Sequence, residues 1–190
     1  MIISHKYELV FVTTPKAGSL TGFTLMRDYF EAVGKFNHRR NIPSGVTKYH
    51  SFTFVRNPYE RFCSVFNARV AMKQPQFIKQ VPEKAKSSME AFASWMINFT
   101  PPADSISGVY TSQSYWHKKS SVKEFIHIED AAKVFTERYP ELNIKFPHAR
   151  QRKHKAWDDV KTDELTLLIN KWAGEDFERF GYKKEFNIPS

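Results

Sequence analysis

The chain has 190 residues, of which 41% are hydrophobic and 15% aromatic, so we expect a packed globular protein with a sizeable core and exclude a disordered chain. Its 29 Lys and Arg residues against 20 Asp and Glu residues give a net charge of +9, which favours anionic partners without choosing among nucleotides, nucleic acid, acidic glycans and membrane headgroups. The single cysteine, Cys63, excludes an intrachain disulfide and fits a reducing compartment.

The N-terminal residues enter the first expected strand almost at once, which leaves no room for a signal peptide. No apolar run is long enough to span a membrane. Neither a linker nor a repeat divides the sequence. We therefore expect one domain over residues 1–190, soluble and cytoplasmic.

A strand, a tight loop and a helix are predicted near the N-terminus. The short apolar run Leu9–Val12 is typical of a buried strand, and Pro15 and Gly18 end it. Apolar residues at helical spacing follow, with Ser19 or Thr21 as the candidate cap. The pattern predicts a strand–loop–helix unit.

This loop has the chemistry of a phosphate or sulfate site. Backbone N–H groups and the positive end of the helix dipole converge there, and Lys16 adds a full charge. It is not a Walker A loop, because the lysine precedes Gly18 and directly follows Pro15. An ordinary turn between strand and helix is the alternative interpretation.

A second strand is predicted at residues 51–55, followed by a helix that begins at Pro58 with Asn57 as its cap. Arg56 then lies at the carboxyl end of the strand, where sheets of α/β proteins bind ligands. Its planar guanidinium matches a phosphate, and the Ser64 hydroxyl in the helix would complete the site. The pattern predicts a second anion site beside the first.

Two segments resemble the signature motifs of sulfotransferases that use 3′-phosphoadenosine 5′-phosphosulfate (PAPS). Residues 14–21 resemble the family's 5′-phosphosulfate loop, although Leu20 stands where a second hydroxyl residue is usual and the loop is one residue shorter than in carbohydrate-type and bacterial members. Residues 54–64 resemble the 3′-phosphate motif, in which an arginine precedes a serine by eight positions, as Arg56 precedes Ser64.

The resemblance implies an α/β, three-layer P-loop-like fold with a central, mostly parallel sheet flanked by helices. It implies transfer of a sulfuryl group from PAPS to a hydroxyl or amine acceptor, possibly a glycan, leaving adenosine 3′,5′-bisphosphate, with no metal expected. Lys16 would stabilise the leaving phosphate, and His38, in a basic loop, would be the base that takes the acceptor proton, with His50 as the second candidate. The implied nucleotide contacts are Lys16, Ala17, Gly18, Ser19, Leu20, Thr21, Arg56 and Ser64.

The rest of the chain resembles the same family at fewer places. Residues 110–116 would either line the acceptor pocket or pack in the core, and a third strand is predicted at residues 122–128. Glu129 falls where the family often has a glutamate, but capping of the next helix, together with Asp130, is the favoured role. Residues 146–155 resemble the loop that closes over the nucleotide, and residues 175–182 resemble the family's C-terminal Asp-Phe…Phe-Gly-Tyr ending.

Two other classes of function remain open from the residues alone. A P-loop kinase or NTPase would explain the loop but needs a Walker lysine–hydroxyl pair and an acidic magnesium ligand. A non-enzymatic polyanion binder would rest on the basic run around Arg150. No nucleic acid partner is expected, and the acceptor, possibly an acidic glycan, is not identified by the sequence.

Overall fold

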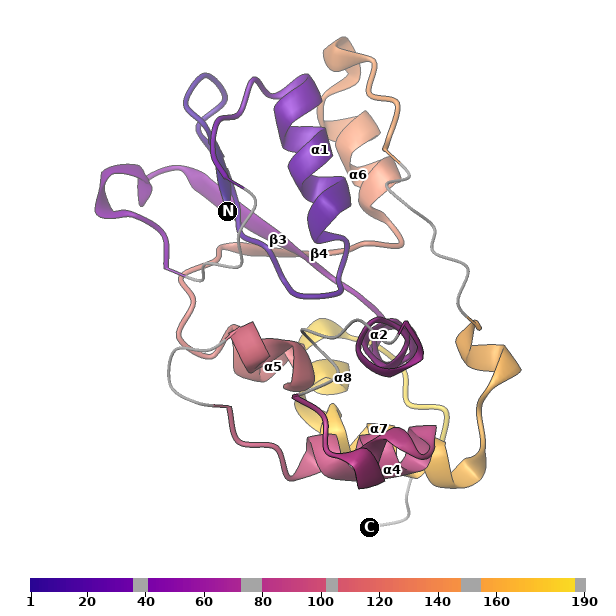
Figure 1. Ribbon diagram of the computed structural model, residues 1–190. Helices are drawn as coiled ribbons and strands as arrows, with labels where there is room; N and C mark the ends of the chain where they lie inside the picture. Colours follow the sequence, from indigo (N-terminus) through magenta and orange to yellow (C-terminus); the bar gives the residue numbers. More distant parts are fainter. Residues whose placement is uncertain (36–40, 73–79, 102–105, 148–154, 187–190) are drawn as a thin grey trace. The chain divides into compact units, whose positions relative to one another are not determined.

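The computed structural model of the chain describes residues 1–35, 41–72, 80–101, 106–147 and 155–186. Two compact units are present, the first made of residues 1–56 and 116–152 and the second of residues 57–115 and 153–190 (Figure 1). None of the helices in these ranges is long and apolar enough to cross a membrane.

The first unit is built on a mostly parallel sheet. Within the described residues the strands follow the order β1-β2-β3-β4, in which β1 is antiparallel to β2 while β2, β3 and β4 are parallel. Their bounds are β1 (Ile2–Ser4), β2 (Leu9–Phe11), β3 (His50–Val55) and β4 (Glu124–His127). The strands predicted from short apolar runs are confirmed, and so is the α/β class with a central, mostly parallel sheet flanked by helices.

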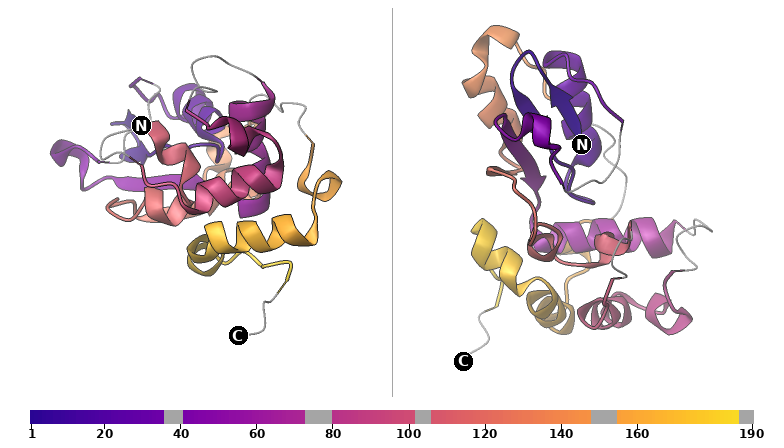
Figure 2. Two further views of the ribbon diagram at one scale, coloured as in Figure 1. Left: turned by 60° about the horizontal axis from the view of Figure 1, so that its bottom comes forward. Right: turned by 90° about the vertical axis from the view of Figure 1, so that its left-hand side faces the viewer.

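One face of the sheet is covered by α1 (Ser19–Tyr29) and α6 (Ala131–Arg138), which lie side by side (Figures 1 and 2). Because side chains alternate along a strand, Phe52 and Phe54 of β3 share this face and pack on Phe135 of α6, with ring centroids 5.2 and 6.2 Å away. Burying each such ring contributes about 2–3 kcal/mol. The sequence alternation of β3 therefore fixes which face holds the aromatic core.

The opposite face carries smaller side chains. Val10 and Val12 pack with Val46 of the 3₁₀ turn η1 (Ser44–Val46). Thr53 of β3 also points to this side and is fully buried. A second 3₁₀ turn, η5 (Pro140–Leu142), follows α6 in this unit. Thr53 contacts Thr14, which lies in the loop after β2.

The second unit is helical and has its own aromatic core (Figure 2, where α4 runs beside α7). Its helices are α2 (Pro58–Phe66), α4 (Met89–Ile97), α7 (Asp163–Trp172) and α8 (Gly174–Phe180), with the short α5 (Gln113–Trp116) at its border. Its other turns are the π-helical η2 (Asn67–Ala71) and the 3₁₀ turns η3 (Glu83–Lys86), η4 (Ile106–Tyr110) and η6 (Trp157–Asp159). Cys63 is buried in this core.

The ends of the helices follow local sequence signals in most cases. The Asn57 side chain caps α2 by accepting a hydrogen bond from the Tyr59 N–H at 3.0 Å, and Pro58 opens the helix, as predicted. Gly181, with φ of +71°, ends α8. The prediction for α6 is only partly correct, since Asp130 is its N-cap residue but makes no side-chain capping bond.

The segment 110–116 is held by two buried charged residues of the second unit. The Arg61 guanidinium donates to the carbonyl of Thr111 at 2.9 Å. The Asp176 carboxylate accepts from the backbone N–H groups of Gln113 at 2.8 Å and Ser114 at 2.6 Å. Asp176 belongs to the C-terminal motif, so this motif anchors the start of α5. Most residues of this segment are therefore buried and have a structural role, while Tyr115 is exposed.

Candidate functional site: the loop between β2 and α1

The backbone of the predicted anion loop folds through two left-handed residues. Lys16 has φ of +66° and Gly18 has φ of +78°. Glycine adopts this conformation freely, but for a residue with a side chain it costs about 1–2 kcal/mol. Such strain persists where surrounding contacts enforce it, and alternating backbone conformations of this kind turn successive N–H groups toward a common point. The loop therefore has the backbone form of an anion-binding turn.

The start of α1 differs from the sequence prediction. Gly18, not Ser19 or Thr21, is the N-cap residue, and it has no side chain with which to cap. The Ser19 hydroxyl instead donates to the carbonyl of Thr14 at 2.6 Å. The first backbone N–H groups of a helix have no carbonyl within the helix to bond. The donors that open α1 are thus left to a ligand or solvent.

Thr14 is the centre of the hydrogen bonds that shape the loop. Its carbonyl accepts the Ser19 hydroxyl and also the Ala17 N–H, at 3.2 Å. The Ala17 N–H is thus engaged within the loop, and its part in holding the nucleotide stays a prediction. The N–H groups of Gly18, Ser19 and Leu20 belong to the N-cap and first turn of α1, and their part in holding the nucleotide is likewise a prediction.

The hydroxyl of Thr14 joins a buried polar cluster that the sequence did not indicate. Its Oγ1 lies 2.7 Å from Thr53 Oγ1 and 2.7 Å from His117 Nε2. Next to His117, the Trp116 indole donates to the Thr13 carbonyl at 3.3 Å. The alternation of β3 places Thr53 on this face, but no sequence signal connects Thr14 to His117, which is 103 residues away.

The other predicted nucleotide contacts are the side chains of Thr21, Lys16, Arg56 and Ser64. Thr21 lies in the first turn of α1 and is partly buried, and Lys16 is partly exposed. Arg56 follows β3 as the last residue of the first unit, and Ser64 is buried in α2 of the second unit. That both side chains bind one 3′-phosphate stays a prediction from their eight-residue spacing.

Of the two candidate bases, His38 and His50, the structure describes only His50. His38 lies outside the described residues, and so does the stretch 148–154 of the basic run. His50 begins β3, at the opposite end of the parallel strands from the loop that follows β2. Its Nε2 lies 2.6 Å from Glu124 Oε2. His50 is therefore part of a structural network, and we do not propose it as the base.

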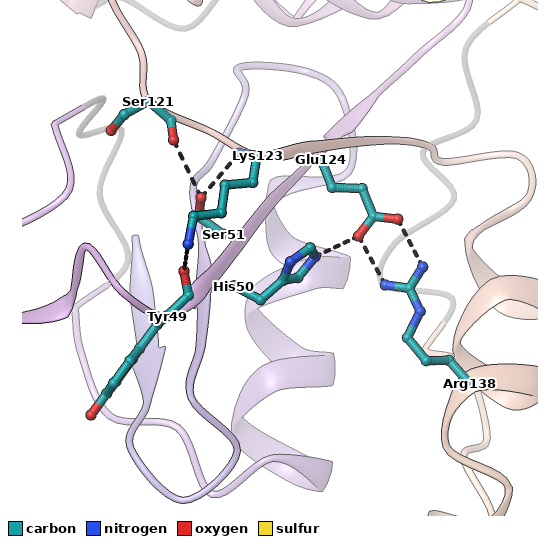
Figure 3. A network of polar contacts seen from close by, with 7 residues as sticks. All are labelled: Tyr49, His50, Ser51, Ser121, Lys123, Glu124 and Arg138. Atoms are coloured by element: carbon teal, nitrogen blue, oxygen red, sulfur yellow. Dashed lines mark hydrogen bonds and ion pairs between the residues drawn. The ribbon is translucent and has the colours of Figure 1, made fainter.

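Figure 3 shows that this network ties β3, β4 and α6 together. Arg138 of α6 donates two parallel bonds to the carboxylate of Glu124, at 2.8 Å to Oε2, which also contacts His50, and at 2.7 Å to Oε1. Lys123 donates to the carbonyl of Tyr49 at 2.7 Å, and its N–H donates to Ser51 Oγ at 3.1 Å. The hydrogen bonds from Arg138 and then from His50 lower the pKa of Glu124 to about 2, against the opposing effect of burial.

This pKa predicts an acid-dependent loss of stability. Glu124 has a pKa near 4.5 when unperturbed and about 2 in the fold, so its contribution is complete above pH 4.5 and is lost as the pH falls towards 2. We expect Glu124→Gln to lower the free energy of unfolding at pH 7 and to lose this disadvantage at low pH. Urea unfolding of both proteins across this range measures it, and a constant difference would contradict the assignment.

The described residues contain no group of three or more His, Cys, Asp or Glu side chains that is close enough to hold a metal ion. Independently of this, the loop offers the Lys16 ammonium and the first backbone N–H groups of α1, which are donors of the kind that bind a phosphate or a sulfate ester.

The chain as a whole is similar to one family of known proteins. The family model described as "Sulfotransferase family" matches residues 1–183 of the chain. Neither the curated proteins nor the solved structures gave a match. The matched range covers the whole first unit, residues 57–115 and 153–183 of the second unit, and every predicted site residue.

Proposed function

Because the chain belongs to the sulfotransferase family, whose members use PAPS, we propose that it moves a sulfuryl group from PAPS to a hydroxyl or amine acceptor. The observation that carries the proposal is the loop after β2, where Lys16 and Gly18 take left-handed conformations next to the amino end of α1. A basic chain of net charge +9 supports an acceptor that is itself anionic, such as an acidic glycan.

The reaction needs an environment that stabilises charge on the leaving nucleotide. The bond between sulfur and the bridging phosphate oxygen breaks, the acceptor oxygen or nitrogen forms a bond to sulfur, and the acceptor proton passes to a base. Lys16 and the N–H groups of Gly18, Ser19 and Leu20 would stabilise the charge that grows on the 5′-phosphate. His38 is the proposed base.

The two ends of the nucleotide would be held separately. The loop would bind the 5′-phosphosulfate, while Arg56 and Ser64 would bind the 3′-phosphate and so distinguish PAPS from nucleotides without that group. A phosphoryl-transfer function has less support, because the sequence lacks the lysine–hydroxyl pair of a Walker A loop.

Calorimetric titration of the whole protein with PAPS and with ATP–Mg²⁺ tests this proposal. We expect binding of PAPS and of adenosine 3′,5′-bisphosphate but not of ATP–Mg²⁺. Incubation with sulfur-labelled PAPS and a panel of neutral and acidic glycans then tests transfer to an acceptor. Binding of ATP–Mg²⁺ in preference to PAPS would overturn the proposal, and labelling of neutral glycans alone would overturn the acidic acceptor.

A further inference from the structure

The cluster of Thr14, Thr53 and His117 lies within the first unit and has no assigned role in the proposed reaction. All three side chains are at most 1% exposed. A buried hydroxyl that bonds two partners at 2.7 Å holds a defined orientation, because the loss of either bond leaves a polar group without water. The position of Thr14 is therefore specified by residues from β3 and from the segment after α5.

The position of Thr14 in turn determines the backbone conformation of the loop between β2 and α1. Its carbonyl is the common acceptor for the Ala17 N–H and the Ser19 hydroxyl, which flank Gly18. Between Thr14 and Ala17 lies Lys16, whose left-handed backbone is unfavourable by itself. A change in the backbone of Thr14 would displace the carbonyl that accepts the hydrogen bonds of Ala17 and Ser19.

We propose that His117 is a positioning residue for the 5′-phosphosulfate loop, acting through the Thr14 hydroxyl. This inference rests on the proposed function, since it assigns the loop to the 5′ end of PAPS. His117 does not touch the nucleotide in this account. It keeps the turn in the conformation that presents the amides of Gly18, Ser19 and Leu20, so that little reorganisation is needed on binding.

The test separates the hydrogen bond of His117 from its packing. The imidazole lies edge-on against Phe125, with ring centroids 5.3 Å apart, so His117→Phe keeps a ring in this space and removes the bond to Thr14. His117→Gln keeps a polar nitrogen near the position of Nε2. His50→Gln is the matched control, since it changes a histidine of the same unit that bonds Glu124 at the far end of β3.

The probes are adenosine 3′,5′-bisphosphate and adenosine 3′-monophosphate, titrated calorimetrically into the whole protein. For His117→Phe we expect about tenfold weaker binding of the bisphosphate, as for one lost buried hydrogen bond, and unchanged binding of the 3′-monophosphate. His117→Gln is expected to recover most of the affinity, and His50→Gln to bind both probes like the unaltered protein. A purely structural role would weaken both probes equally, and such a result would overturn the inference.

A measurement on the unaltered protein covers the case in which His117→Phe does not fold. The ring nitrogen signals of His117 in ¹⁵N NMR, assigned with His117→Gln, should shift on addition of the bisphosphate and not of the 3′-monophosphate. Absence of that shift, or full affinity in His117→Phe, overturns the inference about His117 and leaves the proposed function intact. If the unaltered protein binds neither PAPS nor the bisphosphate, the proposed function fails and this inference fails with it.

Discussion

Replacement of Lys16 by glycine is expected to slow sulfuryl transfer greatly while giving a more stable protein than replacement by alanine. Both variants lose the charge proposed to stabilise the leaving phosphate, a loss that costs about 100-fold or more in rate for comparable groups. Only glycine relieves the left-handed backbone at φ +66°, so Lys16→Gly should be about 1 kcal/mol more stable than Lys16→Ala. Thermal unfolding and the rate of transfer from PAPS measure the two effects.

The control for Lys16 is Lys133→Ala, which removes one exposed lysine from α6. We expect that variant to keep the transfer rate and the melting temperature. If Lys16→Ala retained normal transfer, the proposed role of Lys16 would be wrong. If Lys16→Gly were less stable than Lys16→Ala, the left-handed conformation would not be a source of strain in this loop.

A second large effect is expected at Gly22, where α1 packs directly on the ring of Phe11. A Cβ atom at Gly22 would lie 2.1 Å from the nearest carbon of that ring. Phe11 cannot move aside easily, because it is fully buried with the rings of Phe52 and Phe54 only 5.2 and 5.1 Å away. Gly22→Ala should therefore destabilise the protein by about 3 kcal/mol, as for other overpacked cores.

Gly174→Ala is the matched control, since the same substitution at the start of α8 meets no atom within 4 Å. An added methyl group in a helix at an open site stabilises by up to about 1 kcal/mol. Urea unfolding should thus give opposite signs for the two variants. A Gly22→Ala protein as stable as the unaltered one would show that α1 does not approach β2 this closely.

The sequence could predict those features that depend on neighbouring residues. Short apolar runs indicated β2 and β3, and Asn57 with Pro58 indicated the start of α2, because caps and strands are specified within a few positions. The family motifs indicated the anion loop for the same reason. The family match over residues 1–183 supports these local signals across nearly the whole chain.

Other features depend on distant parts of the chain and could not be predicted. The bond of His117 to Thr14 exists because the segment after α5 returns to the end of β2, which no local pattern encodes. The left-handed backbone of Lys16 opposes its intrinsic preference and reflects the bonds of its neighbours. The prediction that Ser19 or Thr21 caps α1 was wrong because a hydroxyl near a helix start has a competing acceptor, here the Thr14 carbonyl.

The most direct test of this account is a crystal structure of the protein with adenosine 3′,5′-bisphosphate. We expect the 5′-phosphate to accept hydrogen bonds from the N–H groups of Gly18, Ser19 and Leu20 beside the Lys16 ammonium, and the 3′-phosphate to contact Arg56 and Ser64. A nucleotide bound elsewhere, with solvent alone at the amino end of α1, would contradict it.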